Sequence, residues 1–423
     1  MKQTLHEITP RRGDLGVIAA GQAVSFLGDE IALVGLTLHA YAAGWGPAGV
    51  SALFAAAALG LVLASPPAGR LVDRFDSRLT TVGAAAWQGL CVLALTGATG
   101  TAGGGRGERV AILVLVAALN AGQALAGPAW QALLPEVAPA AGVERAVSVV
   151  RSAQSLAAVA GPAVGGLLVG GVGLTGALIV DAASFGVLLV AALVVRARRR
   201  PAAPAEAVES AATDGGRAGR SGWVAVRADP LLWPLVVGLL VLVLTLQVVN
   251  VADVFLVRGT LHAGPAAYGT LAAVIAAAMV GGSLVGGRLH GGATQARWVL
   301  RSAAAIAATL VLCGVAPGLI WLALAGAGLG VANGVLNVAF ASVVLQRARA
   351  DERGRVLATV GAVVQSGTFG GMILGGVLTS LLPPRAVFVA SGVAGMAVSV
   401  LVARAVRPWR AARPGCGGER MAA

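Results

Sequence analysis

The chain has 423 residues, of which 57% are hydrophobic and only 12% are charged, and its formal net charge at pH 7 is +13. Soluble domains carry about 25% charged residues, so this composition excludes an ordinary soluble globular protein. The mean hydropathy is +0.85, and the apolar residues form runs of about 20, the length that spans a bilayer. We therefore expect an all-α polytopic membrane protein.

The excess of positive charge does not indicate nucleic-acid binding, because no basic stripe is interleaved with aromatic residues. The arginines lie at the ends of the apolar runs. If both chain ends are cytoplasmic, the only arginines between runs that face outside are Arg106, Arg109, Arg258 and Arg385. Because cytoplasmic loops are enriched in Lys and Arg, the sequence predicts a multi-pass protein of the cytoplasmic (inner) membrane with both termini cytoplasmic.

The apolar runs predict twelve transmembrane helices in two groups of six. The first group covers residues 15–41, 50–69, 79–99, 110–134, 146–169 and 174–195. The second covers residues 231–257, 268–287, 298–315, 320–344, 356–381 and 386–405. Residues 201–227 are rich in Ala, Pro, Gly, Glu and Ser, which predicts a linker without a core. The predicted domains are a six-helix bundle at 1–200, a cytoplasmic linker at 201–228, and a six-helix bundle with a short cytoplasmic tail at 229–423.

Charged side chains within the predicted spans need a reason, because each costs about 2.5–3.5 kcal/mol on insertion scales. The candidates for proton coupling are Asp29, Glu30, Asp181, Asp253 and Arg151. Asp29 leads, because it shares one helix face with Gln22 and Ser25, and such a polar stripe should face a water-filled cavity. A carboxylate there could take up and release a proton. The alternative is a structural carboxylate paired with Arg151 or with a backbone group.

The other candidates carry less weight. Glu30 lies about 100° further round the helix, where it could share the proton or face a neighbouring helix. Asp181 is at least as well suited to helix packing as to coupling. Arg151 could pair with Asp29, Glu30 or Asp181, and the sequence does not choose among them.

Three further polar stripes occur, in the fourth, seventh and tenth spans. They are Asn120, Gln123 and Trp130; Gln247, Asn250 and Asp253; and Asn333, Asn337 and Phe340. Together with Gln22 and Ser25, the Asn, Gln, Trp and Phe residues of these stripes predict a substrate cavity. For any single Asn or Gln, an interhelical hydrogen bond is the more common role.

The two halves of the chain repeat weakly. The glycine-rich segment at 161–166 corresponds to residues 371–376, as expected for parallel repeats. A similar offset aligns Gln22 with Gln247 and Ser25 with Asn250.

Residues 69–78 read Gly-Arg-Leu-Val-Asp-Arg-Phe-Asp-Ser-Arg between the second and third apolar runs. This charged decapeptide predicts a turn at the membrane surface. It resembles the signature loop of the major facilitator superfamily. The D-R-F-D variant, the D-A-A-S-F run from Asp181 and the A-D-P-L run around Asp229 are similar to the drug:proton antiporter branch, which includes enterobactin exporters and macrolide-efflux proteins. The resemblance implies proton-driven export of a drug-like compound or siderophore by alternating access.

The resemblance also suggests gating residues. In the decapeptide they are Gly69, Arg70, Asp73, Arg74, Asp76 and Arg78. Asp73 is placed to receive the positive N-terminal end of a helix or an arginine of the second half, for which Arg353 and Arg355 are the candidates. Such a latch would hold the cytoplasmic side closed in one state and open in the other. The alternative is a solvated turn whose arginines only set topology.

Gly161, Pro162, Gly165 and Gly166 resemble the antiporter signature of the superfamily and would form a bendable, closely packed helix at the interface of the halves. The plainer interpretation is small-residue packing. This chain departs from the family pattern at two positions. It has Ala157 where the family has glycine, and it has Asn120 where the family has a membrane arginine before Gln123. The second departure shifts weight for coupling to Asp29.

We therefore expect an exporter of an amphipathic small molecule that exchanges it for protons, works in the lipid bilayer as a monomer and binds no nucleic acid. The alternatives are a proton-coupled importer of a small nutrient, a polytopic membrane enzyme, and a membrane sensor or scaffold without transport. An enzyme is disfavoured because the four histidines are scattered. No G-x-x-x-x-G-K-[ST] run occurs, so the energy should come from a gradient, and we expect no cofactor. The three cysteines lack metal-ligand spacing, so no metal site is expected.

Overall fold

The computed structural model describes residues 13–99, 105–137, 143–195, 217–289, 292–349 and 352–411. Every regular element in these ranges is a helix. Eleven of the described helices are long and apolar enough to cross a membrane. The predicted all-α polytopic fold is confirmed.

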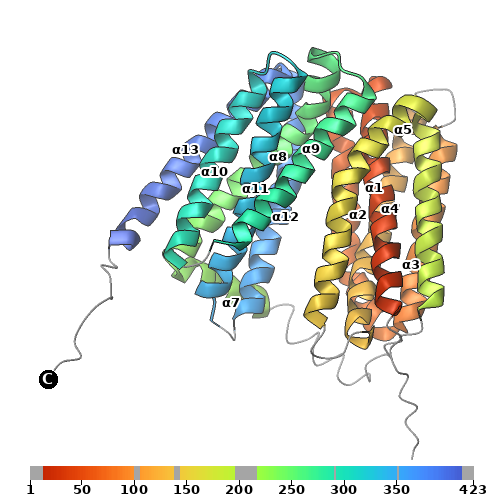
Figure 1. The fold of residues 1–423 in the computed structure, drawn as a ribbon, viewed down its shortest axis with the longest axis horizontal. Helices are drawn as coiled ribbons and strands as arrows, with labels where there is room; N and C mark the ends of the chain where they lie inside the picture. Colours follow the sequence, from red (N-terminus) through yellow and green to blue (C-terminus); the bar gives the residue numbers. More distant parts are fainter. Residues whose placement is uncertain are drawn as a thin grey trace, which may run out of the picture. The chain divides into compact units, whose positions relative to one another are not determined.

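Figure 1 shows the helices in their order along the chain. The first are α1 (Asp14–Ala42), α2 (Gly46–Arg74), α3 (Ser77–Thr99), α4 (Arg106–Val137) and α5 (Val143–Val194). They are followed by α7 (Arg217–Ala228), α8 (Leu232–Val254), the π-helical turn η2 (Phe255–Thr260), α9 (Pro265–Gly287), α10 (Gly292–Gly314), α11 (Leu319–Arg347), α12 (Arg353–Leu381) and α13 (Pro384–Ala411).

Helix α5 contains two membrane spans. A continuous helix of this length would extend about 78 Å, far more than the hydrocarbon core of about 30 Å. The helix breaks at Gly173, where φ is 76° and ψ is −179°, a conformation open essentially to glycine. The two segments match the predicted spans 146–169 and 174–195, so all twelve predicted spans are present.

The charged decapeptide is not the ten-residue turn that the sequence predicts. Helix α2 continues to Arg74 and α3 begins at Ser77, so only Phe75 and Asp76 lie outside the helices. Asp76 Oδ1 accepts a hydrogen bond from the backbone amide of Arg78 at 2.7 Å, which starts α3 as an N-terminal cap does. The Arg78 guanidinium donates to the carbonyl of Leu193 at the end of α5, one of the carbonyls that a helix cannot satisfy itself.

The predicted linker also contains a helix that the sequence did not indicate. Helix α7 packs against α12, with Gly222 and Val226 buried. A methyl group at Gly222 would lie 2.6 Å from the carbonyl oxygen of Arg355. Short helices gain most of their stability from such tertiary packing, and the small, polar composition of the segment gave no sign of it.

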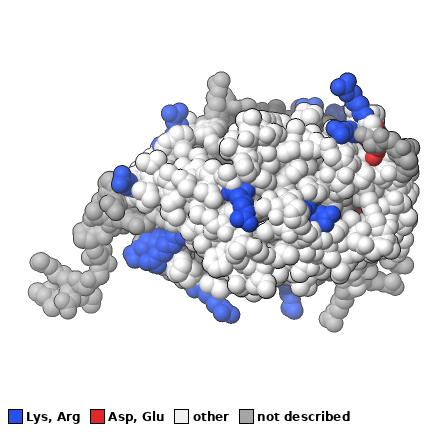
Figure 2. Space-filling view, turned by 90° about the horizontal axis from the view of Figure 1, so that it is seen from above, with Lys and Arg blue, Asp and Glu red and all other residues white. Residues whose placement is uncertain are grey.

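The chain divides into two compact units. Unit 1 is Met1–Ala211 with Val254–Ala276, and unit 2 is Ala212–Asp253 with Ala277–Ala423. In unit 1, α1 packs along α5, and α4 packs against α2 and α3. In unit 2, α10 packs against both α11 and α13. Figure 2 shows a face on which the described residues are mostly uncharged, with scattered arginines or lysines and very few carboxylates.

One helix crossing occurs in both units. A methyl group at Gly165 of α5 would lie 3.0 Å from Ile31 Cα of α1. In unit 2, a methyl group at Gly375 of α12 would lie 3.0 Å from Val248 Cα of α8. Small residues let two helices approach this closely. The crossing agrees with the parallel repeat of the two glycine-rich segments.

The same crossing corrects the alignment of the polar stripes. One turn earlier, Gly161 lies against the Cβ of Glu30, and Gly371 lies against the Cβ of Gln247. Gln247 therefore corresponds in position to Glu30, whereas the sequence aligned it with Gln22. The alignment was wrong by about two helical turns, because matching amide side chains outweighed the packing glycines.

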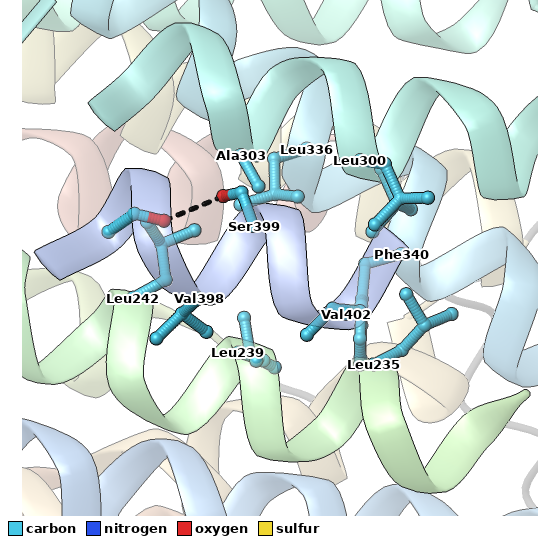
Figure 3. Close-up of a pocket in the computed structure, with 13 residues that line it drawn as sticks. Leu235, Leu239, Leu242, Leu300, Ala303, Leu336, Phe340, Val398, Ser399 and Val402 are labelled. Atoms are coloured by element: carbon cyan, nitrogen blue, oxygen red, sulfur yellow. Dashed lines mark hydrogen bonds between the residues drawn. The ribbon is translucent and has the colours of Figure 1, made fainter. Parts of the chain in front are cut away.

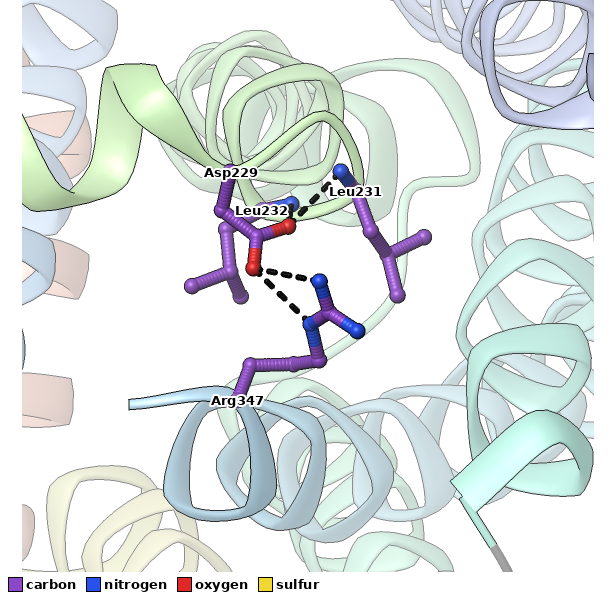
Figure 4. A network of polar contacts seen from close by, with 4 residues as sticks. All are labelled: Asp229, Leu231, Leu232 and Arg347. Carbon is purple, nitrogen blue, oxygen red and sulfur yellow. Dashed lines mark hydrogen bonds and ion pairs between the residues drawn. The ribbon is translucent and has the colours of Figure 1, made fainter. Parts of the chain in front are cut away.

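Asp229 ties two helices together at one end of unit 2 (Figure 4). Its Oδ1 accepts hydrogen bonds from the amides of Leu231 and Leu232, at 2.8 and 3.0 Å, where α8 begins. Its Oδ2 accepts from Nε and Nη2 of Arg347, the last residue of α11, at 2.8 and 2.7 Å. Charge-assisted pairs of this kind are among the stronger hydrogen bonds. One carboxylate thus caps α8 and holds it to α11.

Substitutions of Asp229 should separate these two roles. Asp229→Asn keeps an oxygen that can cap α8, whereas Asp229→Ala removes the cap as well, which typically costs about 1 kcal/mol more. We expect the melting temperature in detergent to fall in the order wild type, Asn, Ala. Arg347→Ala should resemble Asp229→Asn more than Asp229→Ala, since it leaves the cap in place. Equal melting temperatures for Asp229→Asn and Asp229→Ala would show that the cap contributes nothing.

Candidate functional site

A cavity lies within unit 1 between α1, α4 and α5. It holds about 370 Å³ of space between atoms, part of which is open to solvent. Its wall combines polar, aromatic and small side chains: Gln22, Ser25, Phe26, Asp29, Gln123, Ala126, Gly127, Trp130, Gln154 and Leu188. The structure thus brings the whole stripe of α1 and most of the stripe of α4 to one cavity.

Glutamine pairs connect the helices around this cavity. Gln154 Nε2 of α5 donates to Gln22 Oε1 of α1 at 3.0 Å. Gln88 Nε2 of α3 donates to Gln123 Oε1 of α4 at 2.9 Å. An amide has two donor hydrogens and an oxygen with two acceptor sites, so each pair retains hydrogen-bonding capacity toward a ligand.

Asp29 and Trp130, like Ser25, are polar residues of the wall for which no hydrogen bond occurs among the described residues. Asp29 is half-buried and takes part in no hydrogen bond or ion pair between residues that the structure describes. Trp130 Nε1 is buried and has no acceptor among them. Buried polar groups in proteins are nearly always satisfied by protein or water. A free carboxylate and a free N–H on one wall therefore leave two positions at which water or a ligand can bind.

Asp181 and Glu30 lie at helix crossings near this cavity. Asp181 is fully buried, with 0% of its surface exposed, and Ser184 Oγ donates to its Oδ1 at 3.3 Å. Its Oδ2 has no partner in the described part of the chain. A methyl group at Gly28 of α1 would collide with the side chains of Asp181 and Ser184. Glu30 lies against Gly161 on the other side of α1.

Arg151 is not an ion-pair partner for these carboxylates. It is exposed, and its Nη1 donates to Gln154 Oε1 at 3.5 Å, the longest distance at which a hydrogen bond is meaningful. No ion pair joins it to Asp29, Glu30 or Asp181 in the described residues. Pairing of these carboxylates with Arg151, one of the alternatives that the sequence left open, is therefore not supported.

The remaining residue of the α4 stripe has a local role. Asn120 Nδ2 donates to the carbonyl of Val116 at 2.9 Å, one turn earlier in the same helix. It is not among the residues that line the cavity. The side-chain amide of Asn120 is thus hydrogen-bonded to the backbone of its own helix, as Asn side chains commonly are.

The polar stripe of α8 forms a short chain of amides in unit 2. Asn250 donates to Gln247 Oε1, and Gln247 Nε2 reaches Thr368 Oγ1 of α12 at 3.5 Å. Asn250 is exposed, and Asp253 is half-buried. Asp253 takes part in none of the hydrogen bonds between described residues, and the same holds for Asp29 and Glu30.

The stripe of α11 splits into two environments. Asn337 is exposed and donates to Asn333 Oδ1 at 3.4 Å, and Asn333 Nδ2 lies 3.8 Å from the sulfur of Met279. Phe340 is instead buried in an apolar cavity between α8, α10, α11 and α13 (Figure 3). The three residues therefore do not line one site within unit 2.

The apolar cavity contains about 400 Å³ of empty space. Its walls include Leu239 and Leu242, which occupy the positions of α8 that match Gln22 and Ser25 of α1 in the register of the glycine crossing. Its one hydroxyl, on Ser399, already donates to the carbonyl of Gly395 at 2.8 Å. Equivalent helices thus carry polar side chains in unit 1 and leucines in unit 2.

The antiporter-like segment of α5 is a crossing point for two helices of unit 1. Gly161 and Gly165 face α1, as described above. A methyl group at Gly166 would lie 2.6 Å from the carbonyl oxygen of Pro265 and 2.9 Å from Gly269 Cα in α9. The reverse contact is equally tight, since a methyl group at Gly269 would collide with the carbonyl of Pro162. The segment leaves no room for a side chain on either face.

The other predicted gating residues are placed as follows. Gly69, Arg70, Arg74 and Arg353 are exposed. The side chain of Asp73 lies outside the described residues. Arg355 is half-buried, and its Nε is buried without an acceptor in the described part of the chain.

Three polar or aromatic residues at the cavity or bonded to its wall were not predicted from the sequence. Gln154 lies in the fifth span and Gln88 in the third, and Phe26 lies between stripe positions of α1. A signal existed for Gln154, because it follows Arg151 by three residues and so shares its helix face. Gln88 is a single amide in an apolar run, and periodicity cannot detect a single residue.

Twelve spans, an unpartnered carboxylate and a polar cavity walled by helices define a polytopic membrane transporter. The sequence profile of the Major Facilitator Superfamily matches residues 18–290 and 248–416. The chain belongs to this superfamily, and it is a membrane transporter of that kind.

The chain is similar to the "Uncharacterized MFS-type transporter YfiS" of Bacillus subtilis (strain 168), with 29% identity over 176 residues. That match spans 40% of this chain and 39% of the length of the relative. Among solved structures, the nucleoside transporter NupG (D323A mutant) has a TM-score of 0.71 at 12% identity, covering 93% of this chain and 99% of that one. A bacterial homologue of the human lysosomal transporter Spinster has a TM-score of 0.68 at 14% identity, covering 96% of this chain and 98% of that one.

A POT family transporter in complex with 5-aminolevulinic acid has a TM-score of 0.67 at 13% identity, covering 93% of this chain and 96% of that one. At these identities the likeness concerns the fold.

Proposed function

We propose that the chain exports an amphipathic small molecule, such as a drug-like compound or siderophore, in exchange for protons by alternating access. The observation that carries the proposal is Asp29, a carboxylate that takes part in no hydrogen bond or ion pair between described residues and lies on the wall of a polar cavity. The same wall offers amides and two aromatic rings, Phe26 and Trp130. Such a lining suits a ligand with both polar and apolar parts.

Asp29 is the leading coupling residue of the proposal. A carboxylate in a membrane cavity marks an ion or proton pathway by default. Glu30, Asp181 and Asp253 remain secondary candidates. Asp181 is shielded by its crossing with α1, and Glu30 faces Gly161, so both are less open to a substrate than Asp29.

The proposal extends to organisation and location. The functional halves would be residues 1–200 and 229–423, joined by the linker 201–228. Both termini would be cytoplasmic in the cytoplasmic membrane, as the distribution of arginine favours. The whole chain would work as a monomer. Asp73 and Arg353 or Arg355 would form the latch, and the glycine-rich segment of α5 would form the moving contact.

Expression of the chain in an efflux-deficient bacterial host, loaded with a panel of fluorescent amphipathic dyes, tests the proposal. We expect lower accumulation of at least one dye, and a protonophore should abolish the difference. Accumulation that rises with expression, and collapses with the protonophore, would identify an importer instead. A difference that survives the protonophore but follows the sodium gradient would replace the proton by sodium.

A further inference from the structure

Helix α7 lies across the ends of two membrane-spanning helices of unit 2. Gly222 packs on Arg355 and Thr359, in the first two turns of α12. Trp223 meets Trp233, in the first turn of α8, edge to face with ring centroids 6.2 Å apart. Both α8 and α12 are among the helices that can cross a membrane. Because α7 touches the first turns of both, it lies at the level of the membrane surface.

The composition of α7 suits that position. Its sequence, RAGRSGWVAVRA, contains three arginines and no acidic residue. Gly222 and Val226 face the protein, whereas Trp223 is 41% exposed and Val224 is 66% exposed. Arg227 is exposed too, and its guanidinium carbon lies 5.2 Å from the centroid of the Trp233 ring. Tryptophan and arginine on the outer side of a helix are typical of helices that lie in the membrane interface.

We propose that α7 binds the anionic phospholipid surface that surrounds unit 2, with Trp223 and Val224 at headgroup depth and Arg227 on lipid phosphates. Three observations favour lipid over another protein. First, α7 packs against two membrane spans, through Gly222 on α12 and through the contact with Trp233 of α8. Second, its positive charge is complementary to anionic headgroups. Third, it carries no carboxylate that would repel them.

The same contact connects the lipid surface to the transport helices. Gly222 is packed so closely on the start of α12 that α7 cannot tilt toward it without moving Arg355 and Thr359. The Nε of Arg355 has no acceptor in the described residues. Anionic lipid at α7 therefore stabilises the start of α12 in the arrangement seen here. This inference needs no assumption about what the transporter carries or in which direction.

The test uses the full chain carrying Val224→Cys, labelled with a polarity-sensitive fluorophore, in nanodiscs of phosphatidylcholine with rising fractions of phosphatidylglycerol. Cys91 and Cys313 are buried, and Cys416→Ser removes the remaining thiol. We expect the emission to shift to the blue, and brominated lipids to quench it, as the phosphatidylglycerol fraction rises. Replacing Arg217, Arg220 and Arg227 by glutamine together should abolish this dependence.

Arg404→Gln is the matched control, because Arg404 is exposed on α13 and lies outside α7; it should leave the response unchanged. Melting temperatures establish that each variant is folded. Three outcomes would overturn the proposal: a fluorophore that stays in water at every lipid composition, an undiminished response in the triple variant, and a response that follows protein concentration and not lipid. The last would identify a second copy of the chain as the occupant. None of these readouts depends on transport, so failure of the proposed export function would leave them interpretable.

Discussion

Asp29→Asn should abolish substrate movement driven by a pH gradient while the protein still reaches the membrane and binds its substrate. The amide has nearly the same shape as the carboxylic acid, so the wall of the cavity keeps its form. It can neither take up nor release a proton, so the step that links the proton to the substrate is lost. We expect uphill transport to fall by at least about tenfold, which corresponds to about 1.4 kcal/mol in the barrier.

Reconstituted vesicles allow coupling to be separated from binding. Substrate exchange between two equal pools needs no net proton movement, so Asp29→Asn should retain it while losing transport driven by the gradient. Loss of both activities would instead make Asp29 a substrate ligand or a structural group. Normal gradient-driven transport would remove Asp29 as the coupling residue and direct attention to Asp253.

The matched control is Glu136→Gln, which also neutralises a carboxylate in unit 1. Glu136 lies exposed near the end of α4 and outside the cavity wall. It should have no effect on either assay. Glu30→Gln and Asp181→Asn belong in the same series, because both carboxylates lie where α1 crosses α5. If they share a proton with Asp29, their effects should resemble that of Asp29→Asn.

The transmembrane architecture was predictable because the bilayer imposes it. A chain in hydrocarbon has to satisfy its backbone internally, so runs of about 20 apolar residues become helices almost without regard to detail. Even the division of α5 at Gly173 agreed with the break between two predicted runs. Helix α7 was missed for the same reason: it lies at the surface, where no run of that length is required.

The candidate site was predictable only in part. Helical periodicity places Gln22, Ser25 and Asp29 on one face, and the cavity is where that face points. The partner of Gln22 could not be found in this way, because Gln154 comes from a helix more than 100 residues away in sequence. Contacts of that kind depend on how helices cross, and residue spacing within one helix does not report it.

The register between the halves shows the same limit. Two amides at a plausible offset suggested that Gln247 is the repeat equivalent of Gln22, but the glycine contacts make Gln247 the equivalent of Glu30. Glycines set the register because they fix where two backbones touch, whereas the identity of a polar side chain is free to differ between repeats. The resulting difference is that these equivalent positions are polar in unit 1 and apolar, at Leu239 and Leu242, in unit 2.

Gly166→Val should abolish transport, because a side chain there cannot coexist with the contact between α5 and α9. The first added carbon alone would lie 2.6 Å from the carbonyl oxygen of Pro265. Overpacking of this kind typically costs about 1–3 kcal/mol. In a protein that alternates between two states, that cost falls on whichever state closes the α5–α9 contact, and it shifts the equilibrium toward the other by about fivefold to more than a hundredfold.

Gly171→Val is the control for this substitution. Gly171 lies in the same helix, is exposed, and has no atom within 4 Å of the position a side chain would take. Any change in helix propensity is therefore similar in both variants, and only the steric effect differs. Transport by Gly171→Val should remain close to that of the wild type.

A second pair of variants locates the effect in the contact itself. Gly166→Ala and Gly269→Ala each push against the opposite helix, since the added methyl groups would point into the same crossing. Residues that touch are non-additive in double-mutant cycles by about 0.5–3 kcal/mol. We therefore expect the double variant to be little worse than the more severe single one, because a crossing that is already forced apart loses nothing more. Fully additive losses in transport, with unchanged melting temperatures, would mean that the two glycines act at separate places and that the α5–α9 crossing does not gate the transporter.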